Sequence, residues 1–313
     1  MSKITCLAGG VGAARFLQGL LKIVSEGDIT VVGNTGDDIE LYGLHISPDL
    51  DIVMYTLAGI VDEIRGWGIL GDTFNCLEML QKYGYDSWFK LGDKDLATHI
   101  HRTCLLKNGL SLSDATLRLC LSFGLKVKIL PMTNDKMQTK IVTKKGVMHF
   151  QEYLVKRGAQ DEVKNVIFDG VEKAQPVPEV IDSILDADSV IVCPSNPIVS
   201  IGTILSIDNV RNALKKTKAK VVAVSPIVGG APIKGPADKL MRSSGLEVSA
   251  YSVAYLYRDF LDVFIVDHAD RGERKKIDAL GLQTVETNTI MKSLPDKVEL
   301  ARVTLKSVNI TPL

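Results

Sequence analysis

The sequence predicts an α/β fold in which a Rossmann-like, doubly wound parallel sheet carries a mostly helical insertion. The chain opens with an apolar strand, a glycine-rich turn, an amphipathic helix and a second apolar strand within residues 3–33. That order begins a doubly wound sheet with a right-handed crossover. The second half repeats the alternation with near-continuous apolar runs, which are typical of strands covered on both faces.

The core strands are predicted from these apolar runs, and the helices from the 3.6-residue periodicity between them. Near the N-terminus, the pattern places strands at 3–8 and 29–33 and a helix at 13–24. In the second half, it places strands at 188–193, 219–224 and 262–266, and helices at 203–216, 235–244 and 249–258.

The stretch 55–160 departs from this alternation. Helical patterns at 53–65, 73–83, 96–108 and 113–123 precede polar, alternating segments at 138–143 and 147–153. Lys144-Lys145-Gly146 between those segments is typical of a hairpin turn. We therefore expect one domain, 1–313, with a core of 1–54 and 161–313 and an insertion of about 55–160 on the ligand edge of the sheet.

The composition favours a protein that binds small molecules. Lys plus Arg and Asp plus Glu both number 37, so the formal net charge is zero, which offers little to a nucleic-acid backbone. The five cysteines show no C-x-x-C spacing, and Cys6 and Cys193 fall in strands, so buried inert thiols are expected. No apolar stretch reaches the roughly 18 residues of a membrane helix. Without a signal-peptide pattern, we expect a cytoplasmic protein with no membrane or nucleic-acid partner.

The glycine turn Gly9-Gly10-Val11-Gly12 follows the first strand and precedes a helix. Glycines let the backbone approach an anion closely, and a helix N-terminus supplies free N–H groups and a favourable dipole. The G-G-x-G spacing is neither the dinucleotide fingerprint G-x-G-x-x-G nor a Walker A loop. These four residues are therefore predicted to bind phosphate, and the alternative is a turn without a ligand.

Acidic residues follow the second strand. Asp37 and Asp38 end a glycine-flanked turn, where hard oxygen ligands suit Mg²⁺; the alternative is an Asx turn with solvated carboxylates. Asp49 and Asp51 come next. On an extended segment, residues i and i+2 share a face, so these carboxylates are expected to point together towards the same site.

An aromatic segment within the insertion combines Trp88, Phe89 and Lys90 with acidic residues. Either the aromatic side chains are core, or they help to form a pocket for a flat ring with Lys90 at its polar edge. His99 and His101 are two residues apart and diverge on a helix, so a shared metal is not expected.

Two further loops leave predicted strand ends, where α/β sheets bind ligands. Ser195 and Asn196 follow the strand at 188–193, and Ser225 follows the strand at 219–224. Their small hydroxyl and amide groups are natural contacts for phosphate and sugar, although both loops also read as proline-rich connecting turns.

Taken together, these motifs resemble those of the 2-phospho-L-lactate transferase family, CofD. The shared pattern covers almost the whole chain and includes the glycine turn, the Gly33–Asp38 turn and the Pro48–Asp51 segment. The run Trp-Phe-Lys-Leu-Gly-Asp-Lys-Asp-Leu-Ala-Thr-His over 88–99 is the most specific part. The glycine turn alone is also similar to that of a sister family of bacterial nucleotide-sugar-binding proteins.

The resemblance implies a cytoplasmic, homodimeric, Mg²⁺-dependent transferase of coenzyme F-420 biosynthesis. It would move the phospholactyl group from lactyl-2-diphospho-5′-guanosine to the deazaflavin Fo and release GMP. It further implies that Asp51 and Lys90 contact Fo, with Trp88 in the same pocket and residues 55–160 forming part of it. The glycine turn with Ser195 and Asn196 would hold the guanosine diphosphate part, and Asp51 is the candidate to orient or deprotonate the hydroxyl.

Three functions are compared. They are this transferase, a non-catalytic nucleotide-sugar-binding regulator on the same fold, and a nicotinamide-dependent oxidoreductase. The glycine spacing and the crowded acidic turn oppose the oxidoreductase, and the aromatic run at 88–99 favours the transferase over the regulator. The sequence leaves open whether the donor carries phospholactate or phosphoenolpyruvate.

Overall fold

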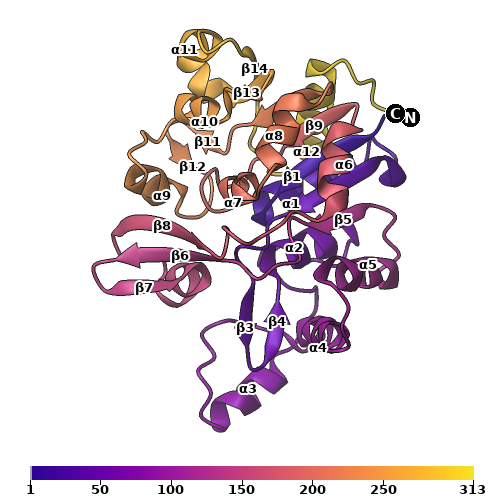
Figure 1. Ribbon diagram of the computed structural model, residues 1–313, viewed down its shortest axis with the longest axis vertical. Helices are drawn as coiled ribbons and strands as arrows, with labels where there is room; N and C mark the ends of the chain where they lie inside the picture. The colour runs from indigo at the N-terminus through magenta and orange to yellow at the C-terminus, as the bar shows by residue number, and fades with distance from the viewer. Residues whose placement is uncertain (1) are drawn as a thin grey trace.

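A computed structural model describes residues 2–313 as a central parallel sheet between two layers of helices (Figure 1). The sheet has seven strands in the order β14-β13-β10-β9-β1-β2-β5. Their bounds are β1 (Ile4–Ala8), β2 (Ile29–Gly33), β5 (Lys128–Pro131), β9 (Ser189–Val192), β10 (Lys220–Val224), β13 (Val263–Asp267) and β14 (Gln283–Thr287). The predicted Rossmann-like class is confirmed, and five of these strands match the predicted ones to within a residue or two.

The direction in which the chain adds strands reverses between β1 and β9. Every neighbouring pair in the sheet is parallel, with Ile4 opposite Ile29 on one side and opposite Ser189 on the other. The loops that follow β1 and β9 therefore leave the sheet side by side and in opposite directions, which creates the crevice where doubly wound sheets bind ligands.

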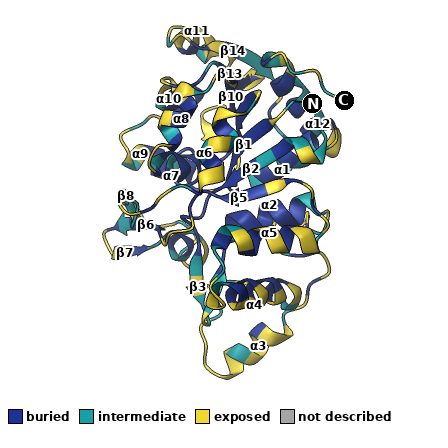
Figure 2. Cartoon of the chain, turned by 45° about the vertical axis from the view of Figure 1, so that its right-hand side comes forward, coloured by how far each residue is buried: buried dark blue, intermediate teal, exposed yellow. Residues whose placement is uncertain are grey.

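Helices cover both faces of the sheet and bury two apolar cores. One face packs against α1 (Gly10–Leu20), α2 (Pro48–Leu57), α5 (Leu112–Ser122) and α12 (Leu294–Ser307). The other packs against α6 (Pro178–Leu185), α7 (Ile201–Ser206), α8 (Val210–Lys216), α9 (Ala237–Ser243), α10 (Ala250–Tyr257) and α11 (Arg274–Asp278). Apart from the edge strand β14, the strands between them are largely buried (Figure 2).

Three predicted helices differ from the structure. The first begins inside the glycine turn, at Gly10 instead of residue 13, so its N-terminus faces the end of β1. The helix predicted at 53–65 lies at Pro48–Leu57, because proline favours the first helical turn and Gly59 takes a left-handed φ of 70° just past its end. The helix predicted at 203–216 is divided into α7 and α8, where Asn209 adopts a φ of 62°.

The predicted insertion contains α3 (Asn75–Lys82), α4 (Asp93–Lys107) and α5, followed by the expected hairpin of β6 (Gln138–Thr143) and β7 (Gly146–His149). A π-helical turn (Glu152–Lys156) follows the hairpin. The predicted limits 55–160 need two corrections. β5 lies within them but belongs to the central sheet, and β8 (Val163–Asp169) lies beyond them but pairs with β6. Treating the chain as one domain stays a prediction.

The remaining short elements are the hairpins β3 (Ile39–Leu41) with β4 (Leu44–Ile46) and β11 (Ile227–Val228) with β12 (Ala231–Pro232), and the 3₁₀ turns Glu26–Asp28 and His268–Glu273. Cys6 and Cys193 are buried and free, as expected. Over residues 2–313, no helix is long and apolar enough to cross a membrane.

Candidate active site

A cavity of about 740 Å³ opens at the carboxyl edge of the sheet, at the reversal between β1 and β9. Its walls come from the loops after β1, β2, β9, β10 and β14, from α2, and from the aromatic segment and α4. Asp38 and Trp88 are not among its lining residues, although both were predicted site residues. The predicted residues that do line it are Gly9, Gly10, Val11, Gly12, Asp37, Asp51, Lys90, Ser195, Asn196 and Ser225.

The glycine turn is pressed against the loop after β9. The Gly9 N–H donates a hydrogen bond to Ser195 Oγ at 3.2 Å. A Cβ on Gly12 would lie 2.2 Å from the Pro194 carbonyl oxygen, so only glycine fits there. α1 has no acidic residue in its first turn, so its free N–H groups and dipole favour an anion in the cavity.

Two of the groups predicted to bind the nucleotide, the Asn196 amide and the Ser225 hydroxyl, have partners within their own loops. Asn196 Oδ1 accepts hydrogen bonds from the N–H groups of Ile198 and Val199, at 3.0 and 3.2 Å. Ser225 Oγ donates to the Ile227 carbonyl at 2.9 Å and is buried. Asn196 Oδ1 and Ser225 Oγ therefore shape their loops, while the free N–H groups at the start of α1 remain to meet a phosphate at this edge.

The side chains of the adjacent residues Asp37 and Asp38 point in different directions, and only that of Asp37 lines the cavity. Asp38 accepts hydrogen bonds from Ser47 Oγ at 2.8 Å and His45 Nε2 at 2.9 Å, away from the cavity. Asp37 faces the cavity, where Gln151 Nε2 donates to it at 3.4 Å. Burial raises the pKa of Asp37 well above its ordinary value, the Asp49 charge raises it further, and Asp37 Oδ1 has no hydrogen-bond partner.

Asp49 is the carboxylate that lies closest to the glycine turn. It stands in the first turn of α2 and accepts a hydrogen bond from Asn34 Nδ2 at 2.9 Å. Burial raises the pKa of Asp49 to about 6, against the opposing effect of hydrogen bonds from Asn34 and the Gly10 backbone. Sequence reasoning noted Asp49 but assigned it no role. The Pro48 that precedes it was the available signal that a helix begins here.

The pair Asp37 and Asp49 fits a magnesium ion better than the predicted pair Asp37 and Asp38. Within residues 2–313, no group of three or more His, Cys, Asp and Glu side chains is placed to hold a metal. Mg²⁺, however, usually takes only one or two carboxylates together with substrate phosphates. A divalent cation would supply the missing partner of Asp37 Oδ1 and reduce the repulsion between the two carboxylates, so the donor set suits it.

Asp49 and Asp51 both line the cavity, as predicted, but they lie on a helix instead of an extended segment. Residues i and i+2 of a helix diverge, so the two carboxylates have different partners. The buried Arg102 guanidinium binds both oxygens of Asp51, with Nη1 3.1 Å from Oδ2. Arg102 Nη1 also lies 3.3 Å from His99 Nδ1. A guanidinium only donates, so Nδ1 accepts and the ring proton resides on Nε2.

This charged network continues along α4. His99 Nε2 lies 3.2 Å from Asp95 Oδ1, and the Tyr55 hydroxyl donates to the same oxygen at 2.7 Å. Burial raises the pKa of Tyr55 well above its ordinary value, so the hydroxyl keeps its proton and acts as a donor. Asp51, Asp95, His99 and Tyr55 all line the cavity. Sequence reasoning identified only Asp51, because the other partners meet it through tertiary contacts.

The tryptophan that lines the cavity is not the one predicted from the sequence. Phe89 and Lys90 line the cavity, while Trp88 packs edge-on against Phe89 with ring centroids 5.6 Å apart. Trp67, which sequence reasoning did not single out, lines the cavity instead. Its signal in the sequence is the pair of glycines, Gly66 and Gly68, on either side.

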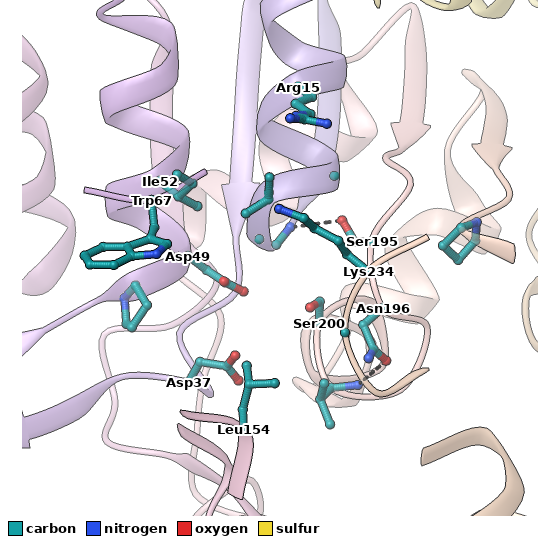
Figure 3. Close-up of a pocket in the computed structure, with 18 of the residues that line it drawn as sticks. Arg15, Asp37, Asp49, Ile52, Trp67, Leu154, Ser195, Asn196, Ser200 and Lys234 are labelled. Atoms are coloured by element: carbon teal, nitrogen blue, oxygen red, sulfur yellow. Dashed lines mark hydrogen bonds between the residues drawn. The ribbon is translucent and has the colours of Figure 1, made fainter. Parts of the chain in front are cut away.

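The cavity therefore has two chemically different sides. In Figure 3, the Asp49 and Asp37 carboxylates lie between the Trp67 indole on one side and Ser195 and Asn196 on the other. A glycine turn at the switch point of a parallel sheet, with buried carboxylates beside an aromatic wall, is the kind of arrangement in which α/β enzymes bind small-molecule substrates.

Comparison with known proteins identifies the family. Residues 4–304 match the family 2-phospho-L-lactate transferase CofD, so the chain belongs to that family and is a transferase. The chain is 42% identical to the 2-phospho-L-lactate transferase of Methanosarcina mazei over 300 residues, covering 96% of this chain and 98% of the relative. It is 43% identical to the phosphoenolpyruvate transferase of Kitasatospora aureofaciens over 310 residues, covering 97% of each.

Among solved structures, a protein of the UPF0052 family from Bacillus halodurans matches with a TM-score of 0.68. The match covers 97% of this chain and 99% of that one at 15% sequence identity. At that identity the likeness concerns the fold alone.

Proposed function

We propose that this chain transfers the 2-phospho-L-lactyl group of lactyl-2-diphospho-5′-guanosine to the terminal ribityl hydroxyl of the deazaflavin Fo, releasing GMP and forming the precursor of coenzyme F-420. The observation that carries the proposal is one cavity with a phosphate-binding side and an aromatic side, separated by two buried carboxylates (Figure 3). The names of the relatives support it.

The donor lies against the glycine turn in this proposal. The N–H groups at Gly10, Val11 and Gly12 face the diphosphate, as at other helix N-termini that bind phosphate. Asp37 and Asp49 would hold a Mg²⁺ ion that neutralises phosphate charge and stabilises the departing oxygen. Two cationic side chains, those of Arg15 on α1 and of Lys234, also line the cavity and suit a donor that carries several negative charges.

The acceptor lies on the aromatic side. Lys90 and Asp51 remain the predicted polar contacts of Fo, and both line the cavity. Phe89 is an apolar contact, and Trp88 supports it from behind. In this proposal the acceptor pocket includes residues between 55 and 160 that line the cavity, among them Phe89 and Lys90.

The reaction is one in-line displacement at phosphorus. The acceptor hydroxyl forms a P–O bond to the phosphorus that bears lactate, and the bond between that phosphorus and the bridging oxygen breaks. GMP departs with the oxygen, and the hydroxyl proton passes to a carboxylate or to solvent. The protein's contribution to such a transfer is mainly positioning and charge stabilisation. The backbone N–H groups of the glycine turn serve the second purpose.

We expect Asp51 to orient the acceptor hydroxyl, because Arg102 already binds both of its oxygens. The variant Asp51→Asn is then expected to raise the KM for Fo and to lower kcat by less than about tenfold, whereas loss of a general base costs roughly 10²–10⁴-fold. Steady-state kinetics over a range of pH distinguishes the two roles. A fall in kcat of a thousandfold, with loss of the acidic limb of the pH profile, would instead identify Asp51 as the base.

The proposed function is tested by mixing the protein with Fo, the guanosine adduct and Mg²⁺, and following GMP and the phospholactyl product by chromatography. The lactyl and phosphoenolpyruvyl donors are compared in parallel, since relatives carry both names. Turnover with the lactyl donor supports the proposal. Binding of a nucleotide sugar without any binding of Fo would favour the regulator. Light scattering tests the homodimer, which is also part of the proposal.

A further inference from the structure

Trp67 is carried by a short loop that is built to a defined shape. Val61 and Ile69 form an antiparallel bridge that closes the loop between them. Within it, the Asp62 carboxylate accepts hydrogen bonds from the N–H groups of residues 64 and 65, at 3.1 and 3.0 Å. The Asp62 N–H donates to the Gly68 carbonyl at 3.1 Å. This wall loop, residues 61–69, is therefore held by its own hydrogen bonds.

The base of the wall loop is attached to the core of the protein. The Glu63 carboxylate accepts a hydrogen bond from Gln18 Nε2 of α1 at 2.8 Å. It also lies 3.7 Å from Nζ of Lys297, a nearly buried lysine of α12. These contacts with α1 and α12, two helices that pack on the same face of the central sheet, hold the wall loop in place beside the cavity.

The two glycines beside Trp67 determine where the indole points. Gly66 has a φ of 76° and Gly68 a φ of 71°, a region that L-residues with side chains rarely occupy. The backbone therefore turns on both sides of Trp67. The indole is 39% exposed, yet it lines the cavity. Part of the flat surface of the Trp67 side chain is therefore left open to the cavity, where a ligand can contact it.

The neighbours of the indole leave room for a flat ligand. Phe74 contacts Trp67 edge-on, with ring centroids 6.3 Å apart, and Arg65 lies over the Phe74 ring at 5.1 Å. Pro48 and Ile52 of α2 also line the cavity, and Figure 3 shows Ile52 beside Trp67 with Asp49 below. An apolar slot beside the buried carboxylates results.

We propose that Trp67 is the stacking residue for the planar ring system of the acceptor, and that the wall loop forms the acceptor's ring-binding wall. This inference rests on the proposed function, since it places the deazaflavin ring in that slot. It differs from the sequence-based expectation, which gave this role to Trp88. The flat tricycle presents a face that an indole binds by offset stacking.

The test compares Trp67→Leu with Trp88→Leu. For Trp67→Leu we expect the dissociation constant and KM for Fo to rise roughly tenfold, as loss of a stacked aromatic pair implies. The donor KM is expected to stay unchanged and kcat to change less than threefold. Trp67→Phe is expected to recover most of the affinity. Trp88→Leu is expected to change the KM for Fo far less, because Trp88 does not line the cavity.

A second readout reports stacking directly. Bound Fo is excited at a wavelength where tryptophan does not absorb. Contact with the indole is expected to quench its emission in the wild type but not in Trp67→Leu. Tyr83→Leu, a change at an exposed aromatic residue outside the cavity, serves as the matched control for folding and activity. Gly66→Ala is expected to act like Trp67→Leu, because it strains a left-handed residue next to the indole.

The outcomes separate the inference from the function on which it rests. If the wild type transfers the phospholactyl group but Trp67→Leu binds Fo with unchanged affinity and unchanged emission, the inference is wrong and the proposed function stands. If the larger effect falls on Trp88→Leu, the sequence-based expectation replaces it. If the wild type neither binds Fo nor turns over, both fail.

Discussion

The variant Asp49→Asn is expected to lose at least about 100-fold in turnover, comparable to removal of one preorganised stabiliser of transition-state charge, while gaining stability at pH 7. The carboxylate is buried against the glycine turn with another carboxylate, Asp37, facing the same cavity. Its charge is useful only when a cation and phosphates are present. Asparagine keeps the shape and an acceptor oxygen but removes the charge.

The gain in stability follows from the pKa of Asp49, which burial raises from 3.8 to about 6. The folded protein keeps this proton to higher pH than the unfolded chain does. The stabilisation it provides is therefore complete below about pH 4 and is lost as the pH rises through about 6. At 1.36 kcal/mol per pKa unit, the loss is on the order of 3 kcal/mol. Asp37→Asn is expected to act in the same direction.

Thermal melting between pH 4 and 8, with and without Mg²⁺, measures these effects. We expect the wild type to lose stability over that range and to recover part of it when Mg²⁺ is added. Asp49→Asn is expected to lose less stability over the same range and to recover less with Mg²⁺, since the buried Asp37 still titrates. Asp182→Asn, at an exposed position on α6 far from the cavity residues, is the matched control and should behave like the wild type. Wild-type turnover in Asp49→Asn, with an unchanged pH dependence of melting, would exclude Asp49 from the site.

The fold was predictable where burial alone selects the residues. β1, β9 and β10 are buried along almost their whole length, so their apolar runs mark them out. β14 was not predicted, because this edge strand, Gln-Thr-Val-Glu-Thr, has no apolar run. β5 was not predicted either, because it is four residues long and lies among helices.

The candidate site was predictable where backbone geometry carries the chemistry, as in the glycine turn. It was less predictable where side chains from distant segments meet. Asp51 and Arg102 are 51 residues apart in sequence, and their pairing depends on the packing of α2 and α4. Asp49 was misjudged for a local reason, since an extended segment was assumed where Pro48 begins a helix. The position of Asp49 could therefore have been predicted from its neighbour Pro48. The pairing of Asp51 with Arg102 could not, because it depends on a tertiary contact between two helices.

The second large effect is expected at Gly12, where the glycine turn and the loop after β9 are in closest contact. In Gly12→Ala, the new Cβ would lie 2.2 Å from the Pro194 carbonyl oxygen, a backbone atom that cannot rotate away. The two loops must separate, which costs about 1–3 kcal/mol of stability by analogy with overpacked cores. Because those loops bind the donor's phosphates in the proposed function, we expect its KM to rise at least about tenfold, one factor of ten for each 1.4 kcal/mol lost.

Alanine variants of two other glycines serve as controls, because they distinguish a general loss of stability from a specific loss of donor binding. Gly19→Ala creates a similar clash, 2.2 Å from the Lys297 carbonyl oxygen, but between α1 and α12 and outside the cavity. It is expected to lower the melting temperature as Gly12→Ala does, yet to keep the donor KM. Gly27→Ala meets no atom within 4 Å and is expected to change neither. If Gly19→Ala raised the donor KM as much as Gly12→Ala, the effect would reflect general destabilisation, and the contact between Gly12 and Pro194 would have no specific part in holding the donor.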